Sequence, residues 1–212
     1  MQRVPVIYLS SSMEVLLSSN GRSPLHQVFA PLGEVEALLF VSQSDLGYSV
    51  KICHGGEGGP YASRLKTKCA AAGIDVEMDR YISSSLTLLA GSLLPKRQVS
   101  VMELRLPPGR PAEEYIRLGE HIAQGVEDGV AVVCLDRQGS RENLTGHRDV
   151  QSALQRLKGL KMPSGKCTSL PGDLVRDLIY IAVGISGRLA PSHLFGSAPA
   201  DSQRAFNGCG WF

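Results

Sequence analysis

Short apolar runs recur along the chain, and turn residues separate them. The runs Val4–Leu9, Tyr48–Cys53, Ile74–Met78 and Gln98–Leu106 are rich in β-branched residues and predict strands. Val130–Leu135 is apolar without interruption between two polar segments, which is typical of a strand buried on both faces of a parallel sheet. The run at residues 35–41 has a length that fits either a strand or a helix.

Helical periodicity is clearest after Pro111. Tyr115, Leu118, Ile122 and Val126 repeat at the spacing that places them on one face of a helix, which we expect to end at Gly129. Shorter helices are predicted at residues 13–17, 60–72, 150–157 and 174–189. Strands that alternate with helices predict an α/β fold, in which helices cover a parallel or mixed sheet.

Composition places the chain among globular proteins. It has 212 residues, 43% of them hydrophobic and 20% charged, with a net charge of +2, so it can bury a core and is not a disordered chain. The five cysteines are odd in number and form no CxxC pair, so we expect reduced thiols and neither a disulfide framework nor a metal site. No apolar run approaches the roughly 20 residues that span a bilayer, so no membrane segment is expected.

Two segments are compatible with phosphate chemistry. Cys134 ends a predicted buried strand, and the following segment to Arg141 is a candidate phosphatase-like loop, although Ser140 stands where such a loop has its arginine. The glycine-rich segment at residues 55–59 precedes a predicted helix and is a candidate phosphate cradle, but it matches neither GxGxxG nor a P-loop. For Cys134 we favour a buried apolar role, and for the glycines a flexible turn.

The order of motifs after Ser100 resembles the RlmH family of SPOUT RNA methyltransferases, which modify a pseudouridine of large-subunit ribosomal RNA. The resemblance covers residues 48–196 and is strongest over residues 100–196. It rests on three motifs. A strand ends in Leu135-Asp136 before Gly139, and a helix starts with Ser169–Pro171 followed by Leu174–Arg176. The closing motif is Ser192–Phe195. It implies a SPOUT-like parallel sheet flanked by helices, with the family's backbone knot reduced or lost.

The family's methyl-donor site is incomplete in this sequence. The link from Leu157 to Ser164 is too short for both the strand and the glycine loop that form one wall of the donor cleft in that family. Gly172, Ile181, Gly184 and Gly196 replace polar family residues. The resemblance therefore predicts a pseudoenzyme with no cofactor, whose vestigial donor site would comprise Leu135, Asp136, Gly139, Gly165, Lys166, Thr168 and Leu170.

The function that the resemblance implies is binding of ribosomal RNA, as an assembly factor or component of the large ribosomal subunit. A basic run without intervening acids is a candidate phosphate-contacting surface, formed by Arg156, Lys158, Lys161 and Lys166. Expected partners are ribosomal RNA, ribosomal or assembly proteins, and a second subunit docked on Leu174–Leu189. The alternatives are an active methyltransferase that uses S-adenosylmethionine and a phosphatase-like enzyme at Cys134–Arg141.

The resemblance also divides the chain into three parts. Residues 1–47 are expected to form an N-terminal extension that packs on or leads into the domain, residues 48–196 the SPOUT-like domain, and residues 197–212 a tail. The aromatic residues Phe206, Trp211 and Phe212 of this tail are candidate anchors on a partner. A mitochondrial or other organellar matrix is the favoured location, and the cytoplasm is the alternative.

Overall fold

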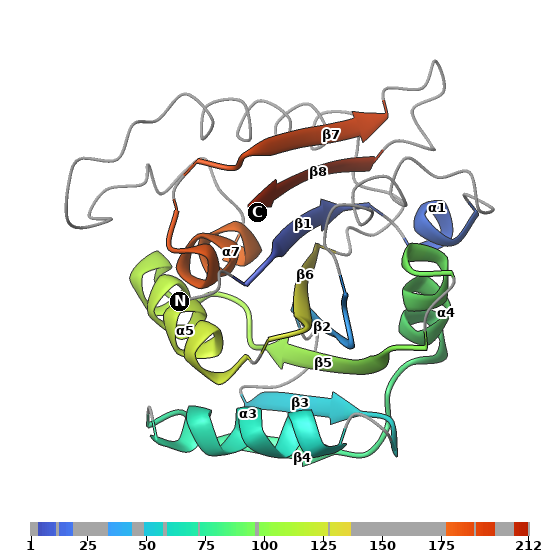
Figure 1. The fold of residues 1–212 in the computed structure, drawn as a ribbon. Coiled ribbons are helices and arrows are strands. Elements are labelled where there is room, and N and C mark those ends of the chain that lie inside the picture. The colour runs from blue at the N-terminus through green and yellow to red at the C-terminus, as the bar shows by residue number, and fades with distance from the viewer. Residues whose placement is uncertain are drawn as a thin grey trace.

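One mixed β-sheet with helices on both faces forms the framework of the protein (Figure 1). The computed structural model describes residues 4–11, 13–18, 34–43, 49–56, 59–71, 73–95, 98–126, 128–136, 177–188, 190–197 and 206–211. Within these residues the α/β class predicted from the sequence is confirmed.

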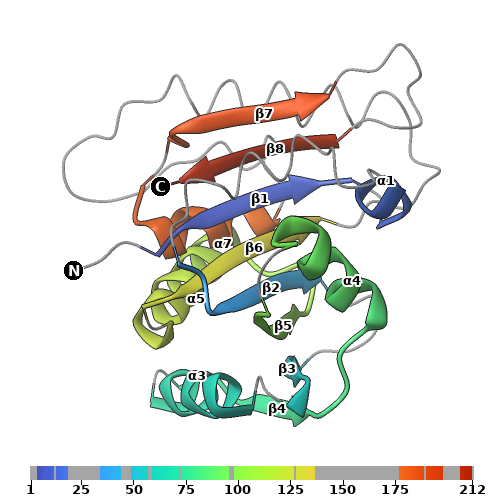
Figure 2. The same ribbon diagram turned by 45° about the vertical axis from the view of Figure 1, so that its right-hand side comes forward.

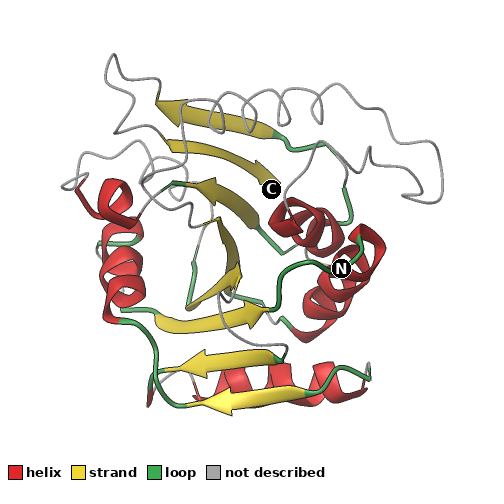
Figure 3. Cartoon of the chain, turned by 180° about the vertical axis from the view of Figure 1, so that it is seen from behind, coloured by secondary structure: helices red, strands yellow, loops and turns green. Residues whose placement is uncertain are grey.

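Eight described strands build the sheet in the order β4-β3-β5-β2-β6-β1-β8-β7 (Figure 3). Their bounds are β1 Val6–Ser10, β2 Ala37–Gln43, β3 Val50–His54, β4 Val76–Asp79, β5 Ser100–Leu106, β6 Val130–Asp136, β7 His193–Ser197 and β8 Phe206–Trp211. The central strands β5, β2, β6 and β1 run parallel to one another. β3 pairs antiparallel with β5 and parallel with β4, while β8 and β7 add an antiparallel hairpin next to β1.

The helices form a layer on each face of the sheet. The first face is covered by α3 (Gly59–Ala71), α5 (Ala112–Gly125) and α7 (Asp177–Ser186), and the second by α1 (Met13–Ser18) and α4 (Ser84–Leu93) (Figure 2). Side chains alternate along each central strand between these two cores. In β6, for example, Val132 faces α5 and α7, while Val133 faces α1 and α4.

The uninterrupted apolar sequence of the central strands follows from this layered arrangement. Every residue of β6 is buried, and six of the seven residues of β2 are buried as well. A strand with helices on both faces has no solvent-facing side, so it carries no alternating polar positions. The apolar run at residues 35–41 therefore belongs to a strand, and β2 covers Ala37–Gln43.

Most elements predicted from the sequence are confirmed, and three were missed. The strands β1, β3, β4, β5 and β6 and the helices α1, α3, α5 and α7 lie where apolar runs or helical spacing predict them. Helix α4 was not predicted because its sequence, SSLTLLAGSL, carries serines and a glycine that weaken the helical pattern. Strand β7 overlaps the closing motif at Ser192–Phe195, and β8 lies in the segment assigned to a tail; glycines and polar residues hide both strands of this hairpin. The helix predicted at residues 150–157 lies outside the described residues.

The three-part division of the chain does not agree with the sheet. β1 and β2, both from residues 1–47, lie in the interior of the sheet on either side of β6. Trp211, expected as an anchor on a partner, pairs with Val6 and is only 1% exposed. Strands from both ends of the chain therefore belong to the same sheet as the strands between them. Backbone groups of the buried strand β6 find their hydrogen-bond partners in β1 and β2, which come from the expected extension.

The expected docking of a second subunit on α7 also needs correction. The apolar side chains of this helix, including Leu178, Ile181 and Ile185, are between 0% and 5% exposed within the single chain. They pack against α5 and against the strands β1, β6 and β2. The apolar stripe therefore belongs to the core of the chain, and the described residues of α7 offer no apolar face to a partner.

Candidate functional site

The carboxyl ends of the four parallel strands meet at one edge of the sheet. Open α/β sheets bind their ligands at this edge, where the loops that follow the strands converge. Here β1 ends at Ser10, β6 at Asp136 and β2 at Gln43, and Pro107 follows β5. The polar side chains around these strand ends are the candidate functional site.

Asp177, the first residue of α7, collects hydrogen bonds from three different segments. Its Oδ2 accepts the amide Nε2–H of Gln43 at 2.6 Å, the hydroxyl of Tyr115 at 3.0 Å and the backbone N–H of Gly109 at 3.5 Å. The helix start also favours a negative charge at this position. The carboxylate therefore ties together the end of β2, the loop after β5 and the helices α5 and α7.

The hydroxyl of Tyr115 is the second centre of this network. It accepts the N–H of Arg110 at 3.3 Å, and it lies 2.9 Å from the carbonyl oxygen of Pro107 as well as close to Asp177. Its single proton is donated to one of these two oxygens at a time. Burial, together with the neighbouring negative charge of Asp177, raises the pKa of Tyr115, so the phenol stays protonated and acts as a donor at neutral pH.

Asp136 is held on the same face of the sheet, at the end of β6. Its Oδ2 accepts the hydroxyl of Tyr8 at 2.8 Å, and the residue is 8% exposed. Because a buried carboxylate without donors would be costly, this bond is part of what allows Asp136 to lie there. Its neighbour Leu135 points to the opposite face, into the core beneath α1 and α4.

Cys134 has the environment of a core residue. Its side chain is fully buried, and burial raises the pKa of its thiol far above the ordinary value. The nucleophile of a cysteine phosphatase is a thiolate in a partly exposed, electropositive setting. Cys134 is therefore placed for packing, in agreement with the apolar role that we favoured, and the loop expected to follow it, to Arg141, lies outside the described residues.

The buried thiols make the free energy of unfolding fall at alkaline pH. Burial raises the pKa of Cys53, Cys69, Cys134 and Cys209 in the folded chain. Each thiol makes its full contribution to the free energy of unfolding below its unfolded pKa of about 8.5. Above that pH the contribution falls by about 1.4 kcal/mol per thiol and pH unit, because the unfolded chain loses the proton first. We expect the free energy of unfolding, measured by urea titration under reducing conditions, to fall between pH 7.5 and pH 9.5 in both proteins. This fall should be about 1 kcal/mol smaller in Cys134→Ala than in the wild type. An identical loss in both proteins would contradict this account.

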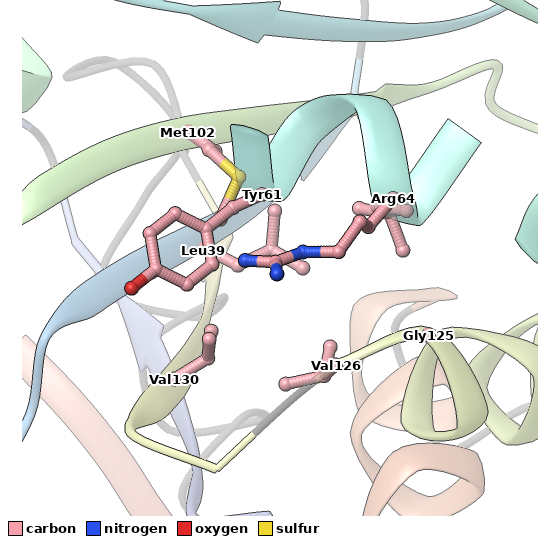
Figure 4. A pocket seen from close by; sticks show the side chains of 8 residues that line it. Leu39, Tyr61, Arg64, Met102, Gly125, Val126 and Val130 are labelled. Atoms are coloured by element: carbon pink, nitrogen blue, oxygen red, sulfur yellow. The ribbon is translucent and has the colours of Figure 1, made fainter. Parts of the chain in front are cut away.

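The opposite, amino edge of the parallel strands is closed by side chains. Arg64 stacks on the ring of Tyr61, with 5.0 Å between its guanidinium carbon and the ring centre (Figure 4). The hydroxyl of Tyr61 donates to Glu36 Oε2 at 3.0 Å. The space beneath them, bordered by Leu39 and Met102, has a volume of about 10 Å³. This is room for about one water molecule, so we assign the part of this edge around Leu39 and Met102 to packing.

Few of the residues predicted for the vestigial donor site and for RNA contact can be placed. Leu135 and Asp136 are described, and they point to opposite faces of the sheet. The others lie outside the described residues: Gly139, Arg156, Lys158, Lys161, Gly165, Lys166, Thr168 and Leu170. The sequence prediction did not include Gln43 and Asp177 as site residues. Gln43 is the polar last residue of the otherwise buried strand β2, which marks a strand end but does not indicate its partner 134 positions away.

Two features are absent from the described part of the chain. No three His, Cys, Asp or Glu side chains lie close enough together to share a metal ion. None of the helices there combines the length and the apolar character needed to cross a membrane.

The fold and the carboxyl edge of its sheet define the class of the protein. It is an α/β protein with a set of polar side chains at the carboxyl ends of its parallel strands. Comparison with protein-family models and with curated proteins finds no match. Among solved structures, the chain is similar to the one described as "Crystal structure of uncharacterized protein JW3007 from Escherichia coli K12". The TM-score is 0.62 at 11% sequence identity, and the match covers 98% of this chain and 99% of that chain. This likeness shows a shared fold.

Proposed function

We propose that the chain is a non-catalytic protein that binds ribosomal RNA, as an assembly factor or component of the large ribosomal subunit in an organellar matrix. The proposal includes a distant kinship with RlmH-type SPOUT methyltransferases whose donor site, and with it the knot, has been lost.

The proposal of a non-catalytic protein rests on the hydrogen bonding and burial of the polar groups at the carboxyl edge. Asp177 accepts bonds from Gln43 and Tyr115, and Asp136 accepts one from Tyr8. These carboxylates hold secondary-structure elements together. The thiol of Cys134 is buried, and its pKa is raised. A general base or nucleophile needs access to a substrate and a pKa matched to its task, and a group held in this way fits a structural role better.

The RNA-binding part is supported by the sequence. The residues from Arg156 to Lys166 carry four basic side chains and no acid, in a chain whose net charge is only +2. A local basic run of this kind contacts phosphates and releases counterions on binding. The kinship is supported by the order of motifs over residues 100–196 alone, since β1 and β2 flank β6 and belong to residues outside the resemblance.

Charge reversal in the basic run tests the proposal. We expect Lys158→Glu with Lys161→Glu to weaken binding to large-subunit ribosomal RNA at least tenfold, and to reduce the slope of log K against log salt by about 2, because two phosphate contacts are lost. Fluorescence anisotropy of labelled RNA fragments at several salt concentrations measures both quantities.

The matched control places the same charge change elsewhere. Lys66→Glu with Lys68→Glu alters two exposed lysines of α3 and gives the same net charge. Equal losses in both double variants would show a general charge effect and contradict a binding site at residues 156–166.

Calorimetric titration with S-adenosylmethionine addresses the alternative: saturable micromolar binding would favour an active methyltransferase over the non-catalytic proposal.

A further inference from the structure

A groove lies where β3 and β4 end and α3 begins, away from the carboxyl edge of the central strands. Its volume is about 630 Å³, within the range of about 300–1,000 Å³ that small-molecule sites occupy. The residues that line it are His54, Gly56, Gly59, Ser63, Met78 and Arg80. Of the described residues that line it, none is acidic; Arg80 carries guanidinium donors suited to an anion, and His54 adds a ring nitrogen.

Arg80 and His54 lie side by side in this groove. The parallel strands β3 and β4 pair Cys53 with Asp79, so the next residues of the two strands are neighbours on the face covered by α3. Arg80 is exposed and forms no ion pair or hydrogen bond with any described residue. Asp79 points to the opposite face, and its Oδ1 accepts the backbone N–H of Tyr81 at 3.0 Å. The guanidinium of Arg80 therefore remains available to a ligand.

The imidazole of His54 is held in one orientation. Its Nδ1–H donates to the carbonyl oxygen of Gly55 at 2.8 Å, and its ring lies against the start of α3, where a Cβ on Gly59 would come within 3.5 Å of Cε1. Because Nδ1 is engaged, Nε2 is the nitrogen left for a ligand.

The backbone around the groove adds donors to these two side chains. β3, the glycines after it, the 13-residue helix α3 and β4 form a β-α-β unit (Figure 1). The first N–H groups of a helix have no partner within the helix, and they point toward the end of the preceding strand. The hydroxyl of Ser63 lines the same groove.

We propose that this groove binds the phosphoryl group of a small phosphorylated molecule, with Arg80 and His54 as its main side-chain contacts. A planar guanidinium suits phosphate geometry because it offers two parallel N–H donors, and Nε2 of the imidazole accepts a hydrogen bond from the P–OH group of a phosphate monoanion. The site is independent of the proposed RNA-binding run, which belongs to residues 156–166.

Calorimetric titration of the full chain with phenyl phosphate, in a low-salt chloride buffer, tests the proposal. We expect saturable binding in the wild type and at least tenfold weaker binding in Arg80→Gln. Gly56→Asp should remove binding as well: its Cβ would meet no atom within 4 Å, so the variant can fold, and its carboxylate repels the phosphoryl group. Arg117→Gln, at an exposed arginine of α5 outside the groove, is the matched control and should bind like the wild type.

The outcomes separate clearly. Loss of phenyl phosphate binding in the two groove variants but not in Arg117→Gln supports the site. No saturable heat up to about 10 mM ligand overturns it, since a site weaker than this contributes less than about 3 kcal/mol of binding free energy. Equal affinity in all four proteins overturns it as well. Binding of ribosomal RNA is measured in a separate experiment, so the phosphate site and the proposed RNA-binding function can each fail without the other.

Discussion

Gly184→Ala is expected to lower the free energy of unfolding by about 2–3 kcal/mol, although alanine is intrinsically the better helix former. The helices α5 and α7 cross at Gly119 and Gly184, where their backbones touch. A Cβ on Gly184 would overlap the carbonyl oxygen of Ile116 and lie 3.0 Å from the Cα of Gly119. Backbone atoms at the contact of two packed helices cannot yield as a flexible side chain does, so the helices must move apart.

Gly91→Ala is the control for the helix contribution of alanine. Gly91 lies in α4, and a Cβ there would meet nothing within 4 Å. This variant should raise the free energy of unfolding by about 0.5–1 kcal/mol, because alanine loses less conformational freedom on folding. Urea unfolding followed by circular dichroism measures both variants. Equal stability of the two variants would contradict the close crossing of α5 and α7.

Glu103→Ala is the second change with a large expected effect, a loss of about 2–4 kcal/mol of unfolding free energy. The side chain of Glu103 is 0% exposed, and its Oε2 accepts Nη2 of Arg105 at 2.8 Å and Nε of Arg105 at 2.9 Å. Its Oε1 accepts the hydroxyl of Ser42 at 2.7 Å. Removing the carboxylate leaves a buried hydroxyl and a largely buried guanidinium without their acceptor. The 28% exposure of Arg105 keeps the loss below that of a fully buried charge.

An exposed ion pair in the same sheet provides the matched control. Lys51 Nζ lies 3.0 Å from Glu77 Oε2, with side-chain exposures of 39% and 57%. Water screens such a pair, so Glu77→Ala should leave the urea midpoint unchanged within error. If Glu103→Ala were as harmless as Glu77→Ala, the buried pair between Glu103 and Arg105 would not exist in solution.

The sequence predicted the central sheet well because its strands are simple to recognise. β6 is buried on both faces, so nearly every residue is apolar and the pattern predicted a strand. β2 is buried on both faces as well, but the length of its apolar run left a strand and a helix open. The spacing of Tyr115, Leu118 and Ile122 likewise predicted the buried face of α5. These elements follow from local patterns of hydrophobic residues.

Strand order and the candidate site depend on pairings between residues far apart in the sequence, which local patterns do not contain. No run of residues shows that β1 and β2 flank β6, or that β8 returns to pair with β1. The bond from Gln43 to Asp177 joins residues 134 positions apart, so neither residue has a local signal of its role. Sequence reasoning placed the first 47 residues outside the domain because the resemblance began after them.

Co-sedimentation of the purified full chain with large ribosomal subunits, without S-adenosylmethionine, tests the central claim most directly. The account predicts that the chain pellets with the subunits at low salt and is released as salt is raised, because phosphate contacts dominate the binding. It also predicts that added S-adenosylmethionine changes neither the binding nor the methylation of the ribosomal RNA. A chain that stays in the supernatant at every salt concentration, or that methylates the RNA, would contradict the account.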